Sequence, residues 1–179
     1  MRQGRLLAEA LRAAAADDLV VMGWSAGERL APWSTNPPPA VVAQALTAAQ
    51  ARSVLLLHAG APRTGSVLIA FDDGEAARHA LALGAQLAEL EDAPLEVVLL
   101  QGRIDEAEHW MEVISASLAE SRPGVSFLHA PKAGLRTLTE IALHHRSRLL
   151  VLDAGRTLAE GEAGRRLLGR LFCSVLLVH

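Results

Sequence analysis

The sequence predicts an α/β fold with a largely parallel sheet, and three observations support this prediction. Seven short runs rich in Val and Leu show no alternation of apolar and polar residues, which is typical of strands buried on both faces. Segments with helical spacing separate most of these runs, as in parallel α/β proteins. Hydrophobic residues make up 51% of the 179 residues and aromatic residues only 3%, so we expect an aliphatic core.

The predicted strands span residues 19–22, 53–57, 67–71, 95–100, 125–128, 149–152 and 175–178. The clearest helical spacing places on one face Ile104, Ala107, Met111, Ile114 and Leu118. The helix after the third strand is predicted to present on one face Ala77, Ala80, Leu81, Gly84, Leu87 and Ala88. Its small residues would allow this helix to lie close to a sheet.

Charge and cysteine content limit the classes of function. The net charge is −3 with no basic stripe, so we expect no nucleic-acid binding. The single cysteine, Cys173, excludes an internal disulfide and is typical of a reducing cytoplasm. No apolar run reaches the roughly 18 residues that a membrane span needs, and the N-terminus lacks an apolar signal core. We therefore expect a cytoplasmic protein without a membrane segment.

An internal repeat organises the chain. "RQGRLLAEALRAAAADDLVVMG" from Arg2 matches "KAGLRTLTEIALHHRSRLLVLD" from Lys132, and "SVLLLH" from Ser53 matches "SVLLVH" from Ser174. The repeat predicts a half unit over residues 1–58, a linker over 59–65 and a full unit over 66–179. Because the half unit lacks a first strand, strand 19–22 should have an open edge, which proteins usually cover. We expect a second copy or sequence upstream of Met1 to cover it.

The full unit resembles a universal stress protein domain in "SVLIAFDDGEAARHALALGAQLAEL" from Ser66, in "RLLVLDAG" and in "CSVLLVH". The half unit is similar to the back half of that domain in "DDLVVMG" and "RSVLLLH". The resemblance implies an open, parallel, five-stranded Rossmann-like sheet in the order 3-2-1-4-5, preceded by a half unit of the same fold. It also implies ligand binding at the carboxyl ends of the strands.

Members of this family commonly pair through their last strands. Strand 53–57 is therefore expected to lie antiparallel to strand 175–178, either of the same chain or of a second chain. The candidate interface residues on these strands are Val54, Leu56, Val175 and Leu177. Trp24 and Trp33, in or beside the first long loop, are further interface candidates, since Trp is enriched at binding hot spots. Packing of both rings against the sheet edge is the alternative.

The family includes members that bind ATP and members that do not. The ATP-binding members share an Asp after the first strand, which Asp72 matches here with Asp73 beside it. They also share a glycine motif after the fourth strand, but Asp153 stands at its first glycine position in the full unit. A carboxylate there would repel a triphosphate by about 1–4 kcal/mol.

The glycine motif of the half unit is also incomplete. Gly23 matches its first glycine, but the next glycine, Gly27, comes one residue late. Prolines stand where a helix start would otherwise offer N–H donors to phosphate. We therefore expect degenerate nucleotide loops and no cofactor, with ATP or AMP bound in a rearranged site near Asp72 as the alternative.

Several other residues have a chemical and a structural interpretation. Asp72 and Asp73 could hold Mg²⁺, but an Asp capping the helix near Gly74 is the favoured interpretation. His129 with the adjacent His144 and His145 does not form a convincing metal set, because neighbouring helical residues point about 100° apart. Cys173 is interpreted as a small buried residue rather than a nucleophile.

Ser25 in "GWSAG" matches a hydrolase nucleophile motif, but the rest of a hydrolase is missing. His58 and His179 are interpreted as polar residues at strand exits. Arg165, Arg166 and Arg170 are assigned to a solvated helix face.

We predict a regulatory or stress-response module without catalytic residues or a metal, acting through homodimerisation and an unidentified protein partner. The alternatives are an adenine-nucleotide-binding protein and a regulatory domain of a longer transporter or kinase.

Overall fold

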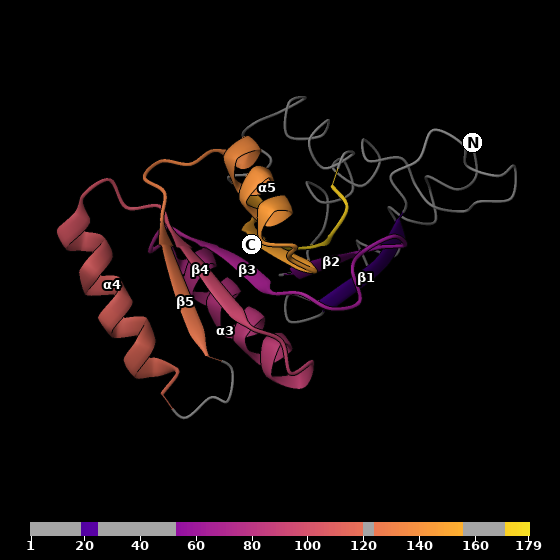
Figure 1. The fold of residues 1–179 in the computed structure, drawn as a ribbon, viewed down its shortest axis with the longest axis horizontal. Helices are drawn as coiled ribbons and strands as arrows, with labels where there is room; N and C mark the ends of the chain where they lie inside the picture. The colour runs from indigo at the N-terminus through magenta and orange to yellow at the C-terminus, as the bar shows by residue number, and fades with distance from the viewer. Residues whose placement is uncertain (1–18, 25–52, 120–123, 156–170) are drawn as a thin grey trace, which may run out of the picture.

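The computed structural model of the protein describes residues 19–24, 53–119, 124–155 and 171–179. Its strands form one seven-stranded sheet with helices on both faces (Figure 1). The elements in chain order are β1 (Leu19–Trp24), β2 (Ser53–His58), β3 (Val67–Phe71), α3 (Glu75–Leu90), β4 (Leu95–Leu99), α4 (Ile104–Ser117), β5 (Val125–His129), α5 (Leu135–His144), β6 (Leu149–Asp153) and β7 (Ser174–Val178). All the predicted strands are present, and their ends differ from prediction by no more than two residues.

The sheet has the strand order β1-β2-β7-β6-β3-β4-β5. The five strands from β3 to β7 are parallel and follow the predicted order 3-2-1-4-5 when numbered along the chain. The sheet does not end at β7, however, because β2 pairs antiparallel with β7 and β1 pairs parallel with β2. The predicted five-stranded sheet is therefore part of a continuous seven-stranded one.

The antiparallel pair β2–β7 resolves the choice between pairing within the chain and pairing with a second chain. Val54 lies opposite Leu177, and Leu56 lies opposite Val175. These four candidate interface residues are fully or almost fully buried within the chain. Since β7 is flanked by β2 and β6, and β2 by β1 and β7, the expectation of a homodimer through the last strands is wrong for this structure.

The strand pairs at the two ends of the repeat have the same register. Leu19 lies opposite Ser53 in β1–β2, as Leu149 lies opposite Ser174 in β6–β7. Across the antiparallel pair, Leu55 faces Leu176, and these two residues match each other in the repeat. A pseudo-twofold axis therefore passes between β2 and β7 at this pair.

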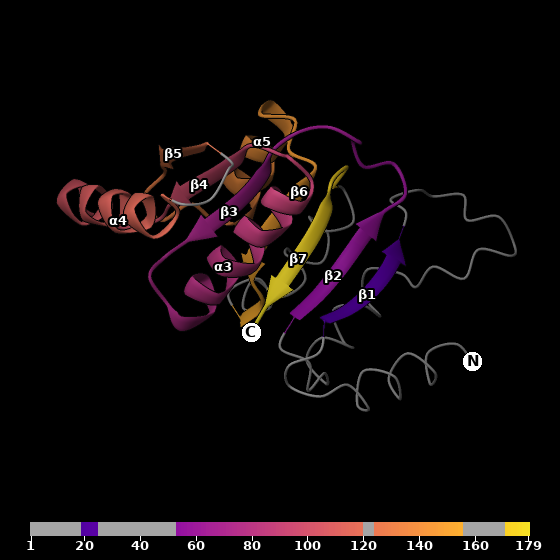
Figure 2. The same ribbon diagram turned by 90° about the horizontal axis from the view of Figure 1, so that it is seen from below.

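The sheet separates two aliphatic clusters. On one face α3 and α4 cover the strands, and on the other face α5 does so (Figures 1 and 2). The residues of α3 that face the sheet are small: Ala77, Ala80, Gly84, Ala85 and Ala88. The predicted face of α4 is buried at Ala107 and Ile114, whereas Ile104 and Met111 are exposed.

Not every strand is buried on both faces, in contrast to the prediction. On β1, Leu19 and Val21 are exposed, and β5 is only partly buried. Both strands lie at an edge of the sheet, where a run of apolar residues does not guarantee a covering helix.

None of the helices in the described part of the chain is both long enough and apolar enough to cross a membrane.

Gly65 allows the chain to turn from the linker into β3. Its φ is 142°, a value that residues with a side chain rarely adopt. A Cβ at this position would also overlap the backbone carbonyl of Arg146. The adjacent contacts are tight, since the Ser66 and Ser147 hydroxyls lie 3.1 Å apart and the Arg148 N–H donates to the Ser66 carbonyl at 2.9 Å.

We predict that Gly65→Ala lowers the free energy of unfolding by about 2 kcal/mol or more, because it combines backbone strain with overlap against another segment's backbone. Urea denaturation monitored by circular dichroism measures the change. Gly124→Ala is the matched control, since a Cβ at Gly124 would meet nothing within 4 Å. Equal stability of the two variants would contradict this account of Gly65.

Candidate functional site

The candidate site lies at the carboxyl ends of β3, β4 and β6. β3 and β6 are neighbours, and the chain continues from them to opposite sides of the sheet, to β4 and to β7. Ligands in open α/β sheets bind at such a switch point. Asp153 ends β6 and Asp72 directly follows β3, so two carboxylate residues lie at this point.

Asp72 and Asp73 shape the turn between β3 and α3. Asp72 Oδ1 accepts a hydrogen bond of 3.1 Å from the N–H of Gly74, the N-cap residue of α3. This bond shapes the turn before α3, but the predicted capping of α3 by an Asp is not found, because the N-cap residue is Gly74 and no side chain caps the first turn of the helix. Asp73 has a left-handed φ of 73° and forms an ion pair of 2.7 Å with Arg78.

Arg78 and Trp110 extend this turn towards α4. The Arg78 guanidinium lies 5.4 Å from the centre of the Trp110 ring, which packs edge-on against Phe71 at 5.3 Å. Arg78 therefore contacts both Asp73 and Trp110, which favours an ordered position at the end of β3. Reasoning from the sequence did not single out either residue, because a lone Arg and a lone Trp on predicted helices carry no motif.

Gln101 is the most unusual residue of the site. It follows the carboxyl end of β4 and is only 9% exposed. Its backbone carbonyl accepts a 2.9 Å hydrogen bond from His129 Nε2, but within the described part of the chain its side-chain amide has no hydrogen-bond partner. A buried amide without a partner costs about 1–3 kcal/mol. Such a group favours a water molecule or a ligand atom at this place.

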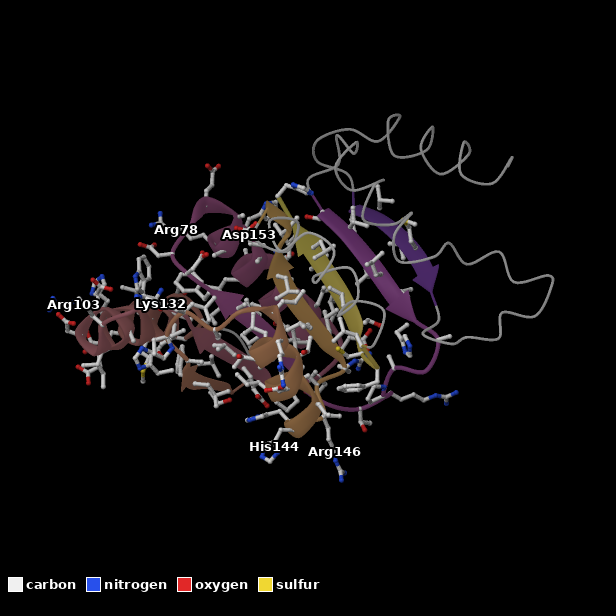
Figure 3. The ribbon with its side chains drawn as sticks, turned by 90° about the horizontal axis from the view of Figure 1, so that it is seen from above. Arg78, Arg103, Lys132, His144, Arg146 and Asp153 are labelled. Carbon is white, nitrogen blue, oxygen red and sulfur yellow. The ribbon has the colours of Figure 1, made fainter. Side chains whose placement is uncertain are left out.

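The charges at the site are mixed. Lys132 adopts a left-handed φ of 57° and its side chain lies beside Gly102, while Asp73 already pairs with Arg78. Figure 3 shows Arg78 and Asp153 at one end of the sheet, and His144 and Arg146 at the other. The partly buried Asp153 places a carboxylate at the carboxyl end of β6, where it would repel a phosphate. This arrangement disfavours a triphosphate at the end of β6.

The structure does not bring the two predicted nucleotide elements together. Gly23 lies in β1, four strands away from β3 in the sheet, a separation of about 19 Å at the usual strand spacing. Because β2 and β7 are antiparallel, β1 and β3 also run in opposite directions, and their carboxyl ends lie at opposite ends of the strands. Outside the described residues lie Gly27, Ser25, Trp33, Pro38, Pro39, Arg165, Arg166 and Arg170. Trp24 ends β1, and only its backbone is described.

The histidines take separate positions. His145 Nδ1 lies 2.7 Å from Glu96 Oε2 at the amino end of the sheet, and the ring of His144 is 5.5 Å from that of His145. His129 bonds the Gln101 carbonyl at the opposite end. In the part of the chain that the structure describes, no group of three His, Cys, Asp or Glu residues could hold a metal ion.

His58 has a structural part at the end of β2. Its Nδ1 accepts a 3.1 Å hydrogen bond from the Gly60 N–H, and its own N–H donates to Ser174 Oγ at 3.2 Å. Burial lowers the pKa of His58 below its ordinary value, which favours the neutral ring that can accept this bond. These contacts agree with its interpretation as a polar residue at a strand exit.

Cys173 is fully buried at the start of β7, and desolvation raises its pKa to about 12. A thiol with this pKa is not a nucleophile at neutral pH. The interpretation as a small core residue is therefore confirmed.

We predict that the Cys173 thiol in the native protein reacts with a disulfide reagent about a hundredfold more slowly than in guanidinium, because reaction requires opening of the core. The thiol contribution to stability should be complete below pH 9.0 and should decline as the pH rises towards 12, where the unfolded state ionises first. Cys173 is the only cysteine, so the reagent reports on one site. Rapid native labelling would contradict its burial.

Comparison with solved structures supports the fold described above. Searches found no matching family model and no curated relative. Among solved structures, a universal stress protein from Archaeoglobus fulgidus DSM 4304 superposes with a TM-score of 0.66 at 12% identity, covering 96% of this chain and 64% of that one. The chain has the universal stress protein fold.

Other universal stress protein structures match in two ways. A protein assigned to the family from Pseudomonas aeruginosa UCBPP-PA14 has a TM-score of 0.60 and 16% identity, covering 99% of this chain and 68% of that one. A universal stress protein in complex with cAMP has a TM-score of 0.52 and 21% identity, covering 64% of this chain and 96% of that one. The chain spans about two thirds of the length of the Archaeoglobus and Pseudomonas proteins. Almost all of the cAMP-bound protein, in contrast, matches about two thirds of this chain.

Proposed function

We propose that this protein is a non-enzymatic, universal stress protein-like regulatory module that acts by associating with a second copy and with a protein partner. In this proposal residues 1–58 form a partial unit, residues 59–65 a linker and residues 66–179 a full unit. The equal registers of β1–β2 and β6–β7 support this division. Relatives that match either the whole chain or about two thirds of it support it as well.

The open outer edge of β1 carries this proposal. β6 has β3 on its outer side. β1 pairs with its neighbour in the same register as β6, but among the strands that the structure describes it is the last one of the sheet. Exposed strand edges present unpaired N–H and C=O groups that readily pair with another chain. Pairing of two β1 edges would join two sheets with no change in either fold.

We predict that light scattering of the purified chain shows a dimer, and that Leu19→Lys shifts it towards monomer, because charged side chains on edge strands oppose pairing. Leu143→Lys is the matched control, since Leu143 is also an exposed leucine but belongs to the helix α5 and not to an edge strand. A monomer at all concentrations would contradict the dimer. A dimer equally weakened by both substitutions would place the interface elsewhere.

Adenine-nucleotide binding is the second candidate, and the unpartnered Gln101 amide favours it. This amide lies at the carboxyl end of β4, on the side of β3 where a ligand at the switch point would extend. One matching structure is a universal stress protein in complex with cAMP. In this chain the candidate would use Gln101 and Asp72 rather than a phosphate loop.

A thermal-shift titration with ATP, ADP, AMP and cAMP, with and without Mg²⁺, separates the two candidates. The non-enzymatic, ligand-free proposal predicts no shift, whereas a ligand at about 100 times its Kd would add about 2.7 kcal/mol of stability. If a shift occurs, Gln101→Leu and Asp72→Asn should remove it. Arg146→Gln, at an exposed position at the opposite end of the sheet (Figure 3), should leave it unchanged. A shift that survives both site substitutions would reject the second candidate.

A further inference from the structure

An apolar groove lies on the face of the sheet next to α3. Leu55 and Leu57 of β2 line its hollow. Leu19 and Val21 of β1 continue the same apolar face, because the four residues alternate along paired strands. Leu19, Val21 and Leu57 are 45%, 52% and 45% exposed. In Figure 2 α3 lies over β3 and β6, while no helix of the described ranges lies over β1 and β2 on this face.

The repeat shows what covers the matching surface in the full unit. The counterparts of the four groove residues are Leu149, Val151, Leu176 and Val178, which are at most 8% exposed. They belong to the cluster that packs against the alanines of α3. The two surfaces therefore have the same side-chain chemistry and register, and one of them carries a helix.

The wall of the groove is apolar as well. A pocket of about 260 Å³ joins Leu55 and Leu57 to Leu87 on the flank of α3, and Arg63, Glu91 and Arg148 line it too. Leu83, Leu87 and Leu90 recur at helical spacing on this flank, and Leu90 is largely exposed. Arg148 and Glu91 form an ion pair of 2.8 Å, so these two of the three charged residues at the pocket are paired with each other.

We propose that this groove binds one amphipathic α-helix, supplied by a partner protein, with a face of Ala and Gly against the sheet and a leucine flank against α3. A helix with small residues can approach the sheet closely, as α3 does where a Cβ on Gly84 would lie 2.5 Å from Ile69 Cδ1. The pseudo-twofold axis between β2 and β7 relates the surface under α3 to this groove, so the bound helix would lie on the same face of the sheet as α3. The inference rests on the proposed partner binding and names the element that binds.

A labelled peptide with the sequence of residues 74–91, which spans α3, is the probe, because α3 covers the matching surface. Fluorescence anisotropy with the full chain should give saturable binding. Leu57→Lys and Val21→Lys should each weaken it by about tenfold, since each places a charge in the apolar floor. Leu143→Lys and Val113→Lys, at exposed apolar positions on other helices, should leave the affinity unchanged.

A second peptide with Ala80→Glu and Ala88→Glu should not bind, because these positions face the sheet in α3. No binding of the first peptide, or equal binding to the groove and control variants, would overturn the inference. Leu57 lies on β2, one strand in from the edge, so its substitution separates the helix site from dimer formation at β1. A monomer that binds the peptide contradicts only the dimer. A dimer that Leu57→Lys dissociates would overturn the inference in favour of a second copy in the groove.

Discussion

The antiparallel pairing of β2 with β7 is the interaction on which the rest of the architecture depends. It joins two strands of nearly identical sequence, and Leu55 and Leu176 meet at its centre. Because it is antiparallel, it is the point at which an otherwise parallel sheet reverses direction. Both faces of this pair are buried by aliphatic side chains except towards the carboxyl end of β2. Association within the chain has thus used the two strands that the family resemblance assigned to dimerisation.

The helix layer follows from the side chains available to the sheet. With only 3% aromatic residues, the core gains its density from close approach of backbone elements rather than from large rings. The alanines and Gly84 of α3 permit this approach over β3 and its neighbours. Such contact needs a helix directly above the strand, which explains why the same aliphatic composition on β1 leaves side chains exposed.

The strands could be predicted because buried aliphatic runs are a strong local signal, and the family resemblance indicated that strands 53–57 and 175–178 would pair. Exposure of Leu19, Val21 and Leu57 could not be read from those runs, since it depends on which helix lies above them. An Asp was expected to cap the helix near Gly74, but Asp72 instead bonds the N–H of Gly74 in the turn before it. Gln101 was not singled out, because its buried amide depends on tertiary packing. Asp153 was recognised only through comparison with a family motif.

The reversal between β2 and β7 also determines how ligand binding at one end of the strands could be coupled to binding at the other end. The carboxyl ends of β1 and β3 face away from each other, so a molecule bound at one end cannot touch a molecule bound at the other. The contacts that connect these two ends are the hydrogen-bond ladder between β2 and β7 and the aliphatic cluster that contains residues of β1, β2, β7 and β6. Leu55 and Leu176 lie opposite each other at the reversal that separates the two ends.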